Sequence, residues 1–576
     1  MSTNPRSEPP NKLAADGNPY QTDELPATFD PADRAAASEP AERSRRRRLG
    51  PWIAAASLLL IFVAQAGKPW LDNQYMNLLS YLLGLIAFLA VAVWALRSEA
   101  PLWARWLPVG GGLAAVAIFL GFNQFVGVTG EMVPIFESRF ARRPEAAAAG
   151  VGTADLSPLS ASDFPGFLGV NRDGVVQRRE FSLDWAGAKE LWRQPVGAAW
   201  SGFAIVGQYA VTLEQRGEGE KGQQWVTCYR IRDGKLVWSH ASPGAHYHVL
   251  GGTGPRSTPT IDQGRVYAQT ALGNVVCLDG RDGSVVWELD LFQLAGLTQT
   301  EAELAVTWGR AGSPLIVSAA GGRWVVVPYG GPRDPSQANS PLGSLIALDA
   351  LTGAVRWIGG NQQISYASPI EATLDGQRQI VSVNESTVSG HAIDDGSVLW
   401  EADWPGSSNG GANCSNPVVY GDDGILLGKG YGGGSQRLRI NHAAPFENRV
   451  EVVWADGRVL KTKFTNAVLD GDYAYALSDG TLECVDLQIA EKLWRQPRGS
   501  RYGQGQLLRV EDVLLVQTEP GDVALVACQS EGFKELSRLD ALSSNTWNYP
   551  AVAGRYLLVR SSREAIAYEL PPREEP

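Results

Sequence analysis

The chain has 576 residues, 44% of them hydrophobic, and its 50 Lys and Arg against 61 Asp and Glu give a formal net charge of −11. Residues 1–48 hold eight basic and eight acidic side chains and residues 49–128 hold three and two, so residues 129–576 keep 39 against 51. This acidic excess excludes a phosphate-backbone binder, so we expect no nucleic-acid partner. Five scattered cysteines also exclude a disulfide scaffold.

Residues 1–48 are expected to form a disordered cytoplasmic tail. They are rich in Pro, Ala, Ser and Asn and show no apolar periodicity, so they cannot bury enough surface to fold. The tail ends in Arg43 and Arg45–Arg48, directly before a hydrophobic segment. We interpret this basic run as a membrane-topology signal; a nucleic-acid patch is the alternative.

Three hydrophobic segments follow, Leu49–Ala66, Leu78–Leu96 and Leu107–Val128, and none contains a charge. At ~1.5 Å per helical residue each approaches the ~30 Å hydrocarbon core of a bilayer. They predict a three-span transmembrane anchor over residues 49–128. Because no ionisable group lies inside the spans, we expect an anchor and not a transporter.

The basic residues beside these segments predict the orientation. The loop between the second and third segments holds Arg97 and Arg105, whereas the loop between the first and second holds only Lys68, beside Asp72. Since cytoplasmic loops carry the excess of Lys and Arg, the N-terminus is expected in the cytoplasm and everything after Val128 outside it. The prediction is a multi-pass protein of the inner (cytoplasmic) membrane with a periplasmic domain.

Residues 129–163 are expected to be a linker, and from Phe164 short apolar runs alternate with tight turns, a pattern typical of β-structure. One eleven-residue pattern recurs, as in Cys277–Trp287 (CLDGRDGSVVW). It reads as strand, turn and strand, with Gly283 supplying the positive φ of the turn. Its tryptophans return about every 50 residues, a propeller-blade spacing. The blade-docking tryptophans are Trp192, Trp238, Trp287, Trp357, Trp400, Trp454 and Trp494.

The two ends of the repeat region complement each other. The C-terminal part supplies three strands, the last near Glu564–Leu570, and then stops, while the strand Lys189–Pro195 has no partner upstream. Joining them in one blade removes exposed sheet edges. The sequence therefore predicts an all-β, eight-bladed β-propeller over residues 164–572, closed by N- and C-terminal strands. An insertion at Leu291–Val306 is expected to add a short helix.

The repeat Ala347–Trp357 (ALDALTGAVRW) resembles the tryptophan-docking motif of the PQQ-repeat (pyrroloquinoline-quinone, quinoprotein alcohol dehydrogenase-like) β-propeller superfamily. Phe167–Val176 (FLGVNRDGVV) resembles the opening of its membrane-anchored, BamB-like members. The resemblance implies two functions. The first is a non-enzymatic scaffold that binds a protein or peptide. The alternative is a periplasmic quinoprotein oxidoreductase that binds PQQ and calcium.

Enzymatic members of this superfamily hold PQQ and calcium on the ring axis with a catalytic Asp, and commonly carry a disulfide between adjacent cysteines. This chain has no adjacent cysteines, and no calcium-binding set of Glu, Asn and Asp can be aligned to it. We therefore favour the non-enzymatic function, and we assign no catalytic or cofactor-binding residue.

A second repeated element, a small residue followed two positions later by Pro, precedes the apolar strand of most repeats, as at Ser257–Pro259. Its counterpart in propellers of this kind lies near the axial mouth, so side chains just before it should converge there. Cations and aromatic groups at such a mouth favour an anionic or aromatic ligand, or an acidic peptide. The alternative is a rim of solvated ion pairs. The candidate ligand-binding residues are Arg256, Trp308, Arg310, Tyr366, Lys461, Lys463, Arg501, Tyr502 and Trp547.

Three of the five histidines, His240, His246 and His248, fall within nine residues. His246 and His248 would share one face of a strand, as metal ligands can. The spacing fixes no third ligand, so these residues are weak metal candidates, and packing inside a structured loop is the alternative.

Overall fold

The computed structural model describes residues 50–66, 73–141, 150, 152–157, 159–298, 301, 306–330, 343–406 and 411–574. The expected disordered cytoplasmic tail, residues 1–48, lies outside the described residues.

Two helices among the described residues, α2 (Asn73–Arg97) and α3 (Leu102–Phe122), are long and apolar enough to cross a membrane. The first hydrophobic segment forms a shorter helix, Gly50–Ala66. At ~1.5 Å per residue this helix falls short of the ~30 Å hydrocarbon core. The prediction of three spans is therefore corrected to two candidate spans, and α3 ends at Phe122 instead of Val128.

The strands β1 (Asn123–Val128) and β2 (Pro134–Ser138) form a hairpin directly after α3. The pairing runs from Asn123 opposite Ser138 to Val128 opposite Pro134. The segment expected to be a linker thus holds a strand, and it presents a turn at residues 129–133. Further along the same segment Leu156 is buried, and Ala154 N donates to Arg281 O of the propeller.

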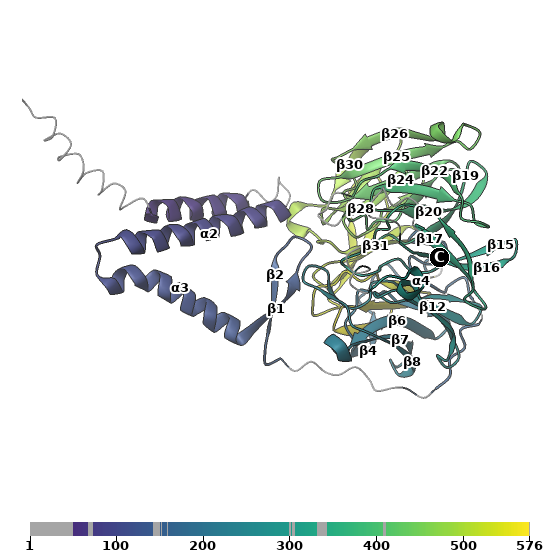
Figure 1. Cartoon of the computed structure of the whole chain (residues 1–576), viewed down its shortest axis with the longest axis horizontal. Helices are drawn as coiled ribbons and strands as arrows, with labels where there is room; N and C mark the ends of the chain where they lie inside the picture. Colours follow the sequence, from purple (N-terminus) through teal and green to yellow (C-terminus); the bar gives the residue numbers. More distant parts are fainter. Residues whose placement is uncertain are drawn as a thin grey trace, which may run out of the picture. The chain divides into compact units, whose positions relative to one another are not determined.

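The propeller consists of eight antiparallel four-stranded sheets within the described residues, one of them extended by β3 (Figure 1). The first four consecutive blades are β5 (Ala204–Val206), β6 (Tyr209–Arg216), β7 (Gln223–Arg230), β8 (Leu236–Pro243); β11 (Thr260–Asp262), β12 (Arg265–Gln269), β13 (Asn274–Asp279), β14 (Val285–Asp290); β15 (Leu315–Ala319), β16 (Gly322–Pro328), β17 (Leu345–Asp349), β18 (Val355–Gly359); and β19 (Ile370–Leu374), β20 (Gln377–Val383), β21 (Thr387–His391), β22 (Val398–Asp403).

The other four blades continue the same meander. They are β23 (Val418–Tyr420), β24 (Gly424–Lys429), β25 (Gly434–Ile440), β26 (Val450–Asp456); β27 (Val468–Asp470), β28 (Tyr473–Ser478), β29 (Thr481–Asp486), β30 (Glu491–Arg495); β31 (Gln506–Val510), β32 (Val513–Gln517), β33 (Val523–Ala527), β34 (Glu535–Leu539); and β35 (Ala551–Ala553), β36 (Tyr556–Arg560), β37 (Glu564–Glu569) with β4 (Lys189–Pro195).

Short elements decorate this ring. A two-stranded hairpin, β9 (Tyr247–His248) and β10 (Gly252–Thr253), leads into the second blade. The helix α4 (Leu291–Ala295) lies within the expected insertion, and the Asp290 carboxylate caps it by accepting from Phe292 N and Gln293 N. The remaining pieces are the 3-10 turns η1 (Gly219–Lys221), η3 (Phe446–Asn448) and η4 (Arg498–Ser500).

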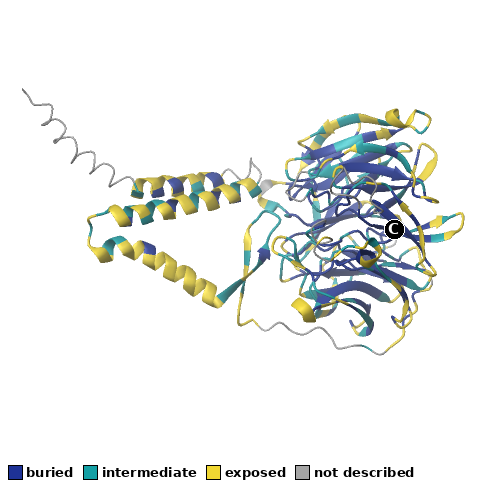
Figure 2. Ribbon diagram, in the orientation of Figure 1, coloured by how far each residue is buried: buried dark blue, intermediate teal, exposed yellow. Residues whose placement is uncertain are grey.

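The N-terminal strand of the propeller, β4, pairs antiparallel with the C-terminal strand β37, and Trp192 stands opposite Ala567. The middle strands of the blades are buried on both faces, as Leu345–Asp349 is throughout, whereas the outermost strands alternate between buried and exposed positions (Figure 2).

Tryptophans on the outermost strands join neighbouring blades. The Trp287 indole nitrogen donates to Ala350 O at 3.1 Å, in the hairpin of the next blade. A Cβ on Gly353 would lie 2.7 Å from the same indole ring. That glycine therefore serves both the positive φ of its turn, +73°, and the close approach of the tryptophan.

Trp400 departs from this pattern. Its indole nitrogen donates to the Gln379 side chain at 2.6 Å, within its own blade. The other six bond a backbone carbonyl close to the hairpin of the following blade, from Trp192, Trp238, Trp287, Trp357, Trp454 and Trp494 to Ile231, Gly280, Ala350, Ile393, Leu487 and Gln529. The next hairpin after Trp400 is the longer connection Asn441–Arg449, which lacks the glycine turn.

The segment Pro165–Val176 crosses the ring from blade to blade. Pro165 O accepts from Ile261 N, the Arg172 guanidinium donates to Pro314 O at 2.7 Å, and β3 (Val175–Val176) runs parallel to β31. Ile261 lies in the middle of β11, Pro314 directly precedes β15, and Val176 stands opposite Val510 at the end of β31. The segment therefore joins the second, third and seventh blades.

Candidate functional site

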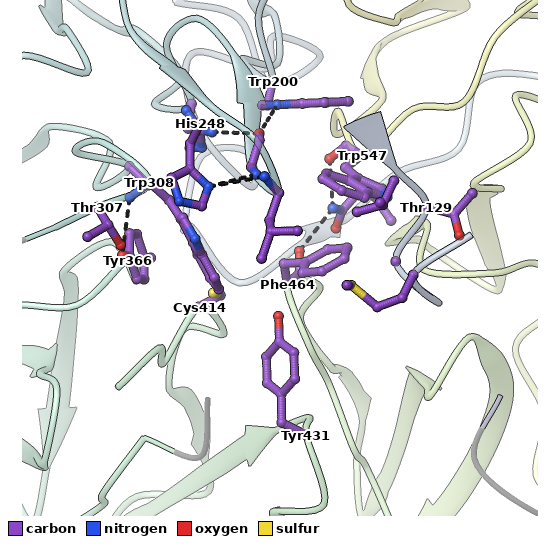
Figure 3. A pocket seen from close by; sticks show the side chains of 18 of the residues that line it. Thr129, Trp200, His248, Thr307, Trp308, Tyr366, Cys414, Tyr431, Phe464 and Trp547 are labelled. Atoms are coloured by element: carbon purple, nitrogen blue, oxygen red, sulfur yellow. Dashed lines mark hydrogen bonds between the residues drawn. The ribbon is translucent and has the colours of Figure 1, made fainter. Parts of the chain in front are cut away.

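A cavity of about 710 Å³ lies at the end of the ring axis from which the innermost strands start (Figure 3). Its walls come from residues of all eight blades and from Phe167 in the crossing segment. Gln74, Tyr75 and Leu78, at the start of α2, and the residues around the β1–β2 turn also line it. This size is typical of pockets that hold a small molecule or a few peptide residues.

A simple positional rule accounts for eleven of the 26 lining residues. In seven of the eight blades, the residue just before the small residue that opens the approach to the innermost strand faces the cavity, and so, in several blades, does the residue two positions later. This alternation by two is what an extended chain produces. The lining residues that follow the rule are Trp200, Arg256 with Thr258, Ala311, Tyr366 with Ser368, Cys414 with Asn416, Phe464, and Trp547 with Tyr549.

Aromatic pairs form two walls of the cavity (Figure 3). Trp308 and Tyr366 stack with ring centroids 4.9 Å apart and planes 27° apart. Trp200 and Trp547 stack at 4.7 Å and 29°. Phe464 packs against Trp547 at 4.7 Å. Each wall thus presents the extended apolar faces on which a flat, apolar ligand packs.

Four of the nine predicted ligand-binding residues, Arg256, Trp308, Tyr366 and Trp547, line this cavity. Sequence reasoning missed Trp200, Phe464 and Tyr431. Phe464 and Trp200 stand at the rule position of their blades, so a strict register would have found them. Tyr431 comes from the β24–β25 turn, which the strand pattern does not align with the axis.

Arg256 is the one Lys or Arg among the described lining residues. Its Nη1 donates to Gly254 O at 2.8 Å, and its Nη2 donates to Gly251 O at 2.6 Å and to Gly252 O at 3.4 Å. Burial lowers the pKa of Arg256 to about 10, so it stays cationic at neutral pH. A Cβ on Gly251 would lie 2.6 Å from Nη2, so a larger residue there would require the guanidinium to shift.

Two predicted cations, Lys463 and Arg501, hold the β1–β2 turn at the mouth instead of facing the cavity. Lys463 Nζ donates to Gly130 O at 3.3 Å, and Arg501 Nη2 pairs with Glu131 Oε1 at 2.6 Å. Gly130 N donates to Glu519 Oε1 at 2.6 Å. The turn is therefore bound to the mouth by charged contacts at its backbone and at its one acidic side chain.

The start of α2 joins the same turn. Asn73 Nδ2 donates to Glu131 Oε2 at 2.9 Å, and Asn77 Nδ2 donates to Glu131 O at 2.8 Å. Lys463 Nζ also donates to Gln74 Oε1 at 2.9 Å. Glu131 thus links the first turns of α2 to Arg501 of the propeller.

The other three predicted residues lie in structural contacts outside the cavity lining. Arg310 is buried and donates to Pro328 O and Tyr329 O, at 2.9 and 2.6 Å. Lys461 pairs with Asp479. Tyr502 is buried and donates its hydroxyl to Glu535 Oε2 at 2.6 Å. Arg310 and Lys461 stand one and three positions before the rule residues Ala311 and Phe464, and Tyr502 belongs to the blade in which the residue just before the small residue is not among the lining residues.

The histidines take separate roles. His248 lines the cavity, and its Nδ1 accepts from Leu250 N and Gly251 N, both at 3.2 Å. His246 is buried next to Gly309, and burial lowers its pKa to about 3. His240 lies on β8 opposite Val226. Among the described residues no group of three His, Cys, Asp or Glu is placed to hold a metal ion.

The lining residues do not fit PQQ with calcium. Calcium takes oxygen ligands that include Asp and Glu carboxylates, and the described lining contains neither residue type. PQQ carries three carboxylates, against which the lining offers the single cation Arg256. All five cysteines are free, and burial raises the pKa of the Cys414 thiol at the cavity to about 12, so it stays protonated.

The fold and the site together define an eight-bladed β-propeller with an aromatic axial cavity. The family model described as "Outer membrane protein assembly factor BamB" matches residues 181–327 and 222–496. The chain belongs to this PQQ-repeat family. No curated protein sequence is significantly similar to it.

Solved structures to which the chain is similar include BamB from Moraxella catarrhalis, with 15% identity and a TM-score of 0.44. That match covers 66% of this chain and 100% of the other. Quinohemoprotein alcohol dehydrogenase from Comamonas testosteroni has 12% identity and a TM-score of 0.40, over 72% of this chain and 81% of the other.

Proposed function

We propose that the propeller is a non-enzymatic binding scaffold that is anchored in the inner membrane and receives a protein or peptide partner on its extracytoplasmic side. The single observation that supports this most is the lining of the axial cavity. The described lining residues include two stacked aromatic pairs and one cation, Arg256, and they include no carboxylate. Such a lining can bind a ligand, but it offers no general base for turnover at neutral pH except His248.

The family supports a protein partner, because its description is that of an assembly factor for outer membrane proteins. The helices α2 and α3 supply the anchor, and Arg97 and Arg105 at their connected ends favour a cytoplasmic loop there. The chain after α3 then emerges on the opposite side, where the propeller folds.

A cofactor titration separates this function from the oxidoreductase alternative. Purified full-length protein is mixed with PQQ and calcium, and tryptophan fluorescence and the reduction of an artificial electron acceptor are followed with primary alcohols present. We expect no saturable quenching that depends on calcium and no dye reduction. Calcium-dependent quenching together with alcohol-dependent dye reduction would establish the oxidoreductase and reject the scaffold.

Photo-crosslinking in intact cells tests the scaffold directly. A photoreactive phenylalanine analogue replaces Leu250, an exposed residue of the cavity rim, or the control Ile489, an exposed residue in the β29–β30 turn. We expect one discrete protein adduct from position 250 and none from position 489, identified by mass spectrometry. Absence of an adduct at position 250 contradicts a partner at this mouth.

A further inference from the structure

The cavity contains a positive charge, Arg256, and no Asp or Glu is among the described lining residues. Arg256 forms no ion pair in the part of the chain that the structure describes, and all its hydrogen bonds go to backbone carbonyls. Those three bonds use three of the five N–H donors of a guanidinium. The remaining donors have no protein partner among the described residues, beside a lining without Asp or Glu.

A cation in an apolar setting is costly unless an anion or hydrogen-bond acceptors compensate it. The glycine carbonyls compensate Arg256 in part, and they also fix its direction, because Gly251 O accepts from the Trp200 indole as well, at 2.7 Å. A ligand carboxylate meeting the free donors would complete the compensation. It would gain a charge-assisted bond in a poorly solvated site.

A second donor stands beside this cation. His248 Nδ1 accepts two backbone N–H groups, so in the neutral ring the proton is on Nε2. Burial and the neighbouring Arg256 both lower the pKa of His248, which keeps the ring neutral at neutral pH. The pair therefore offers one full positive charge and one neutral donor, which matches one carboxylate and not several.

The aromatic walls define the rest of the ligand. The His248 ring lies 6.4 Å from the Trp308 ring, which stacks on Tyr366, and Trp200 bonds the same Gly251 carbonyl as Arg256. Both walls thus begin next to the cation. A ligand whose carboxylate meets Arg256 would lay an attached aromatic ring against one of these walls.

We infer that the axial cavity binds an aromatic monocarboxylate, with Arg256 as the partner of the carboxylate and the stacked aromatic pairs as the seat of the ring. The inference rests on the proposed function in that the propeller binds this group without transforming it. Two kinds of ligand carry an aromatic ring and one carboxylate: a free aromatic acid, and the C-terminal aromatic residue of a peptide.

Calorimetric titration of the full-length protein tests the inference with indole-3-acetate and its uncharged counterpart, indole-3-acetamide. We expect the acid to bind at least about tenfold more tightly than the amide, the difference of one charge-assisted contact. Arg256→Gln should abolish this preference, Arg256→Lys should keep part of it, and Arg281→Gln, on an exposed hairpin, should leave it unchanged. Thermal unfolding establishes that each variant is folded.

Equal affinities for the acid and the amide, no binding of either, or an intact preference in a folded Arg256→Gln variant would each overturn the inference. If the Gln variant fails to fold, the Arg256→Lys variant replaces it, and an undiminished preference in that variant overturns the inference too. Calcium-independent binding of PQQ more tightly than indole-3-acetate would also contradict a monocarboxylate site. If position 250 gives a protein adduct but indole-3-acetate does not bind more tightly than indole-3-acetamide, this inference is rejected and the scaffold function is retained.

The two sources are separated by the tripeptide Gly-Gly-Trp with a free or an amidated C-terminus. If the free peptide binds more tightly than indole-3-acetate and the amidated peptide does not, the cavity receives a chain end. If the small acid binds more tightly than both peptides, the ligand is a free aromatic acid. Either result supports the aromatic carboxylate site.

Discussion

His391 is a titratable side chain sealed inside the fourth blade, β19–β22. Its Nδ1 donates to Gly396 O at 3.1 Å, and its Nε2 accepts from the Ser389 hydroxyl at 2.9 Å. Burial lowers the pKa of His391 from its ordinary 6.5 to about 4. Protonation would place a charge on a ring that is fully buried in the blade and would turn Nε2 from an acceptor into a donor.

His391 should therefore make the propeller sensitive to mild acid. Because the folded pKa lies below the unfolded one, only the unfolded chain gains a proton here as the pH falls from 6.5 toward 4. At about pH 5 this difference removes about 2 kcal/mol from the free energy of unfolding. Urea titrations at several pH values should show a smaller acid loss for His391→Gln than for the wild type. Identical pH dependence contradicts the assignment.

At the scale of single residues the sequence predicts the cavity in part. Arg256, Tyr366 and Trp547 could be found because each directly precedes a recognisable small-x-Pro element. The sequence analysis selected Lys463 for its charge, but its neighbour Phe464 lines the cavity. The period of two along an extended chain, and not the charge, determines which side chain faces the axis. The roles of Lys463 and Arg501 depend on a distant turn that no local pattern reveals.

At the scale of elements, the docking tryptophans determine how one blade holds the next. The Trp287 ring packs on the turn around Gly353 and donates to Ala350 O, so it supplies both buried area and one hydrogen bond. Trp400 supplies buried area between blades but no indole hydrogen bond between them, because its bond to Gln379 stays within its own sheet. Other groups supply hydrogen bonds across the interface after the fourth blade, such as the bond from Arg449 Nη1 to Leu399 O at 2.6 Å.

Trp287→Ala should destabilise the propeller by about 3 to 5 kcal/mol, because it opens a cavity between two blades. Trp287→Phe should cost about 1 to 3 kcal/mol, since it keeps most of the packing but leaves Ala350 O without its donor. Leu351→Ala, at an exposed position in the same turn, should stay within about 0.5 kcal/mol of the wild type. Chemical denaturation measures all three. Equal losses for the three variants contradict the docking role.

The β1–β2 turn is the element that controls the mouth of the cavity. Its Glu131 connects Asn73 at the start of α2 with Arg501 of the propeller, and Met132 lines the cavity. The ion pair of Glu131 with Arg501 is three-quarters or more buried on both sides. Removing one partner of such a pair costs more than removing an exposed charge.

Glu131→Gln should loosen this turn. Glutamine cannot form the ion pair, so Arg501 loses its charged partner while keeping the Asp479 carbonyl, and the amides of residues 128–133 should exchange with solvent about tenfold faster. Glu447→Gln, at an exposed site in η3, serves as the control and should leave their exchange unchanged. Hydrogen exchange with mass spectrometry measures both. Unaltered protection in Glu131→Gln would show that the backbone contacts alone hold the turn.

At the scale of the whole molecule, the eight-bladed propeller follows from the sequence because its signal is repeated. A tryptophan about every 50 residues and a glycine turn four residues before most of them constrain one another. The anchor was predicted less well. Hydropathy alone cannot distinguish Asn123–Val128, a strand in the structure, from the end of a span, because four of its six residues are apolar or glycine.

The orientation of the anchor is the last prediction. Arg97 ends α2 and Arg105 lies in the first turn of α3, so their connection carries a concentrated positive charge. The other ends of these helices, at Asn73 and Phe122, are uncharged. Because positive loops stay in the cytoplasm, this connection should be cytoplasmic and the chain after β2 extracytoplasmic.

Fusions of a reporter that is active only outside the cytoplasm test this orientation. A fusion after Ser138 should be active, and a fusion at Ser98, within the connection, should be inactive. Replacing both Arg97 and Arg105 by Asn removes the positive charge of this connection, so it should lower the activity of the Ser138 fusion. A fusion that is inactive after Ser138 and active at Ser98 would place the propeller in the cytoplasm and would contradict both the orientation and the proposed extracytoplasmic partner.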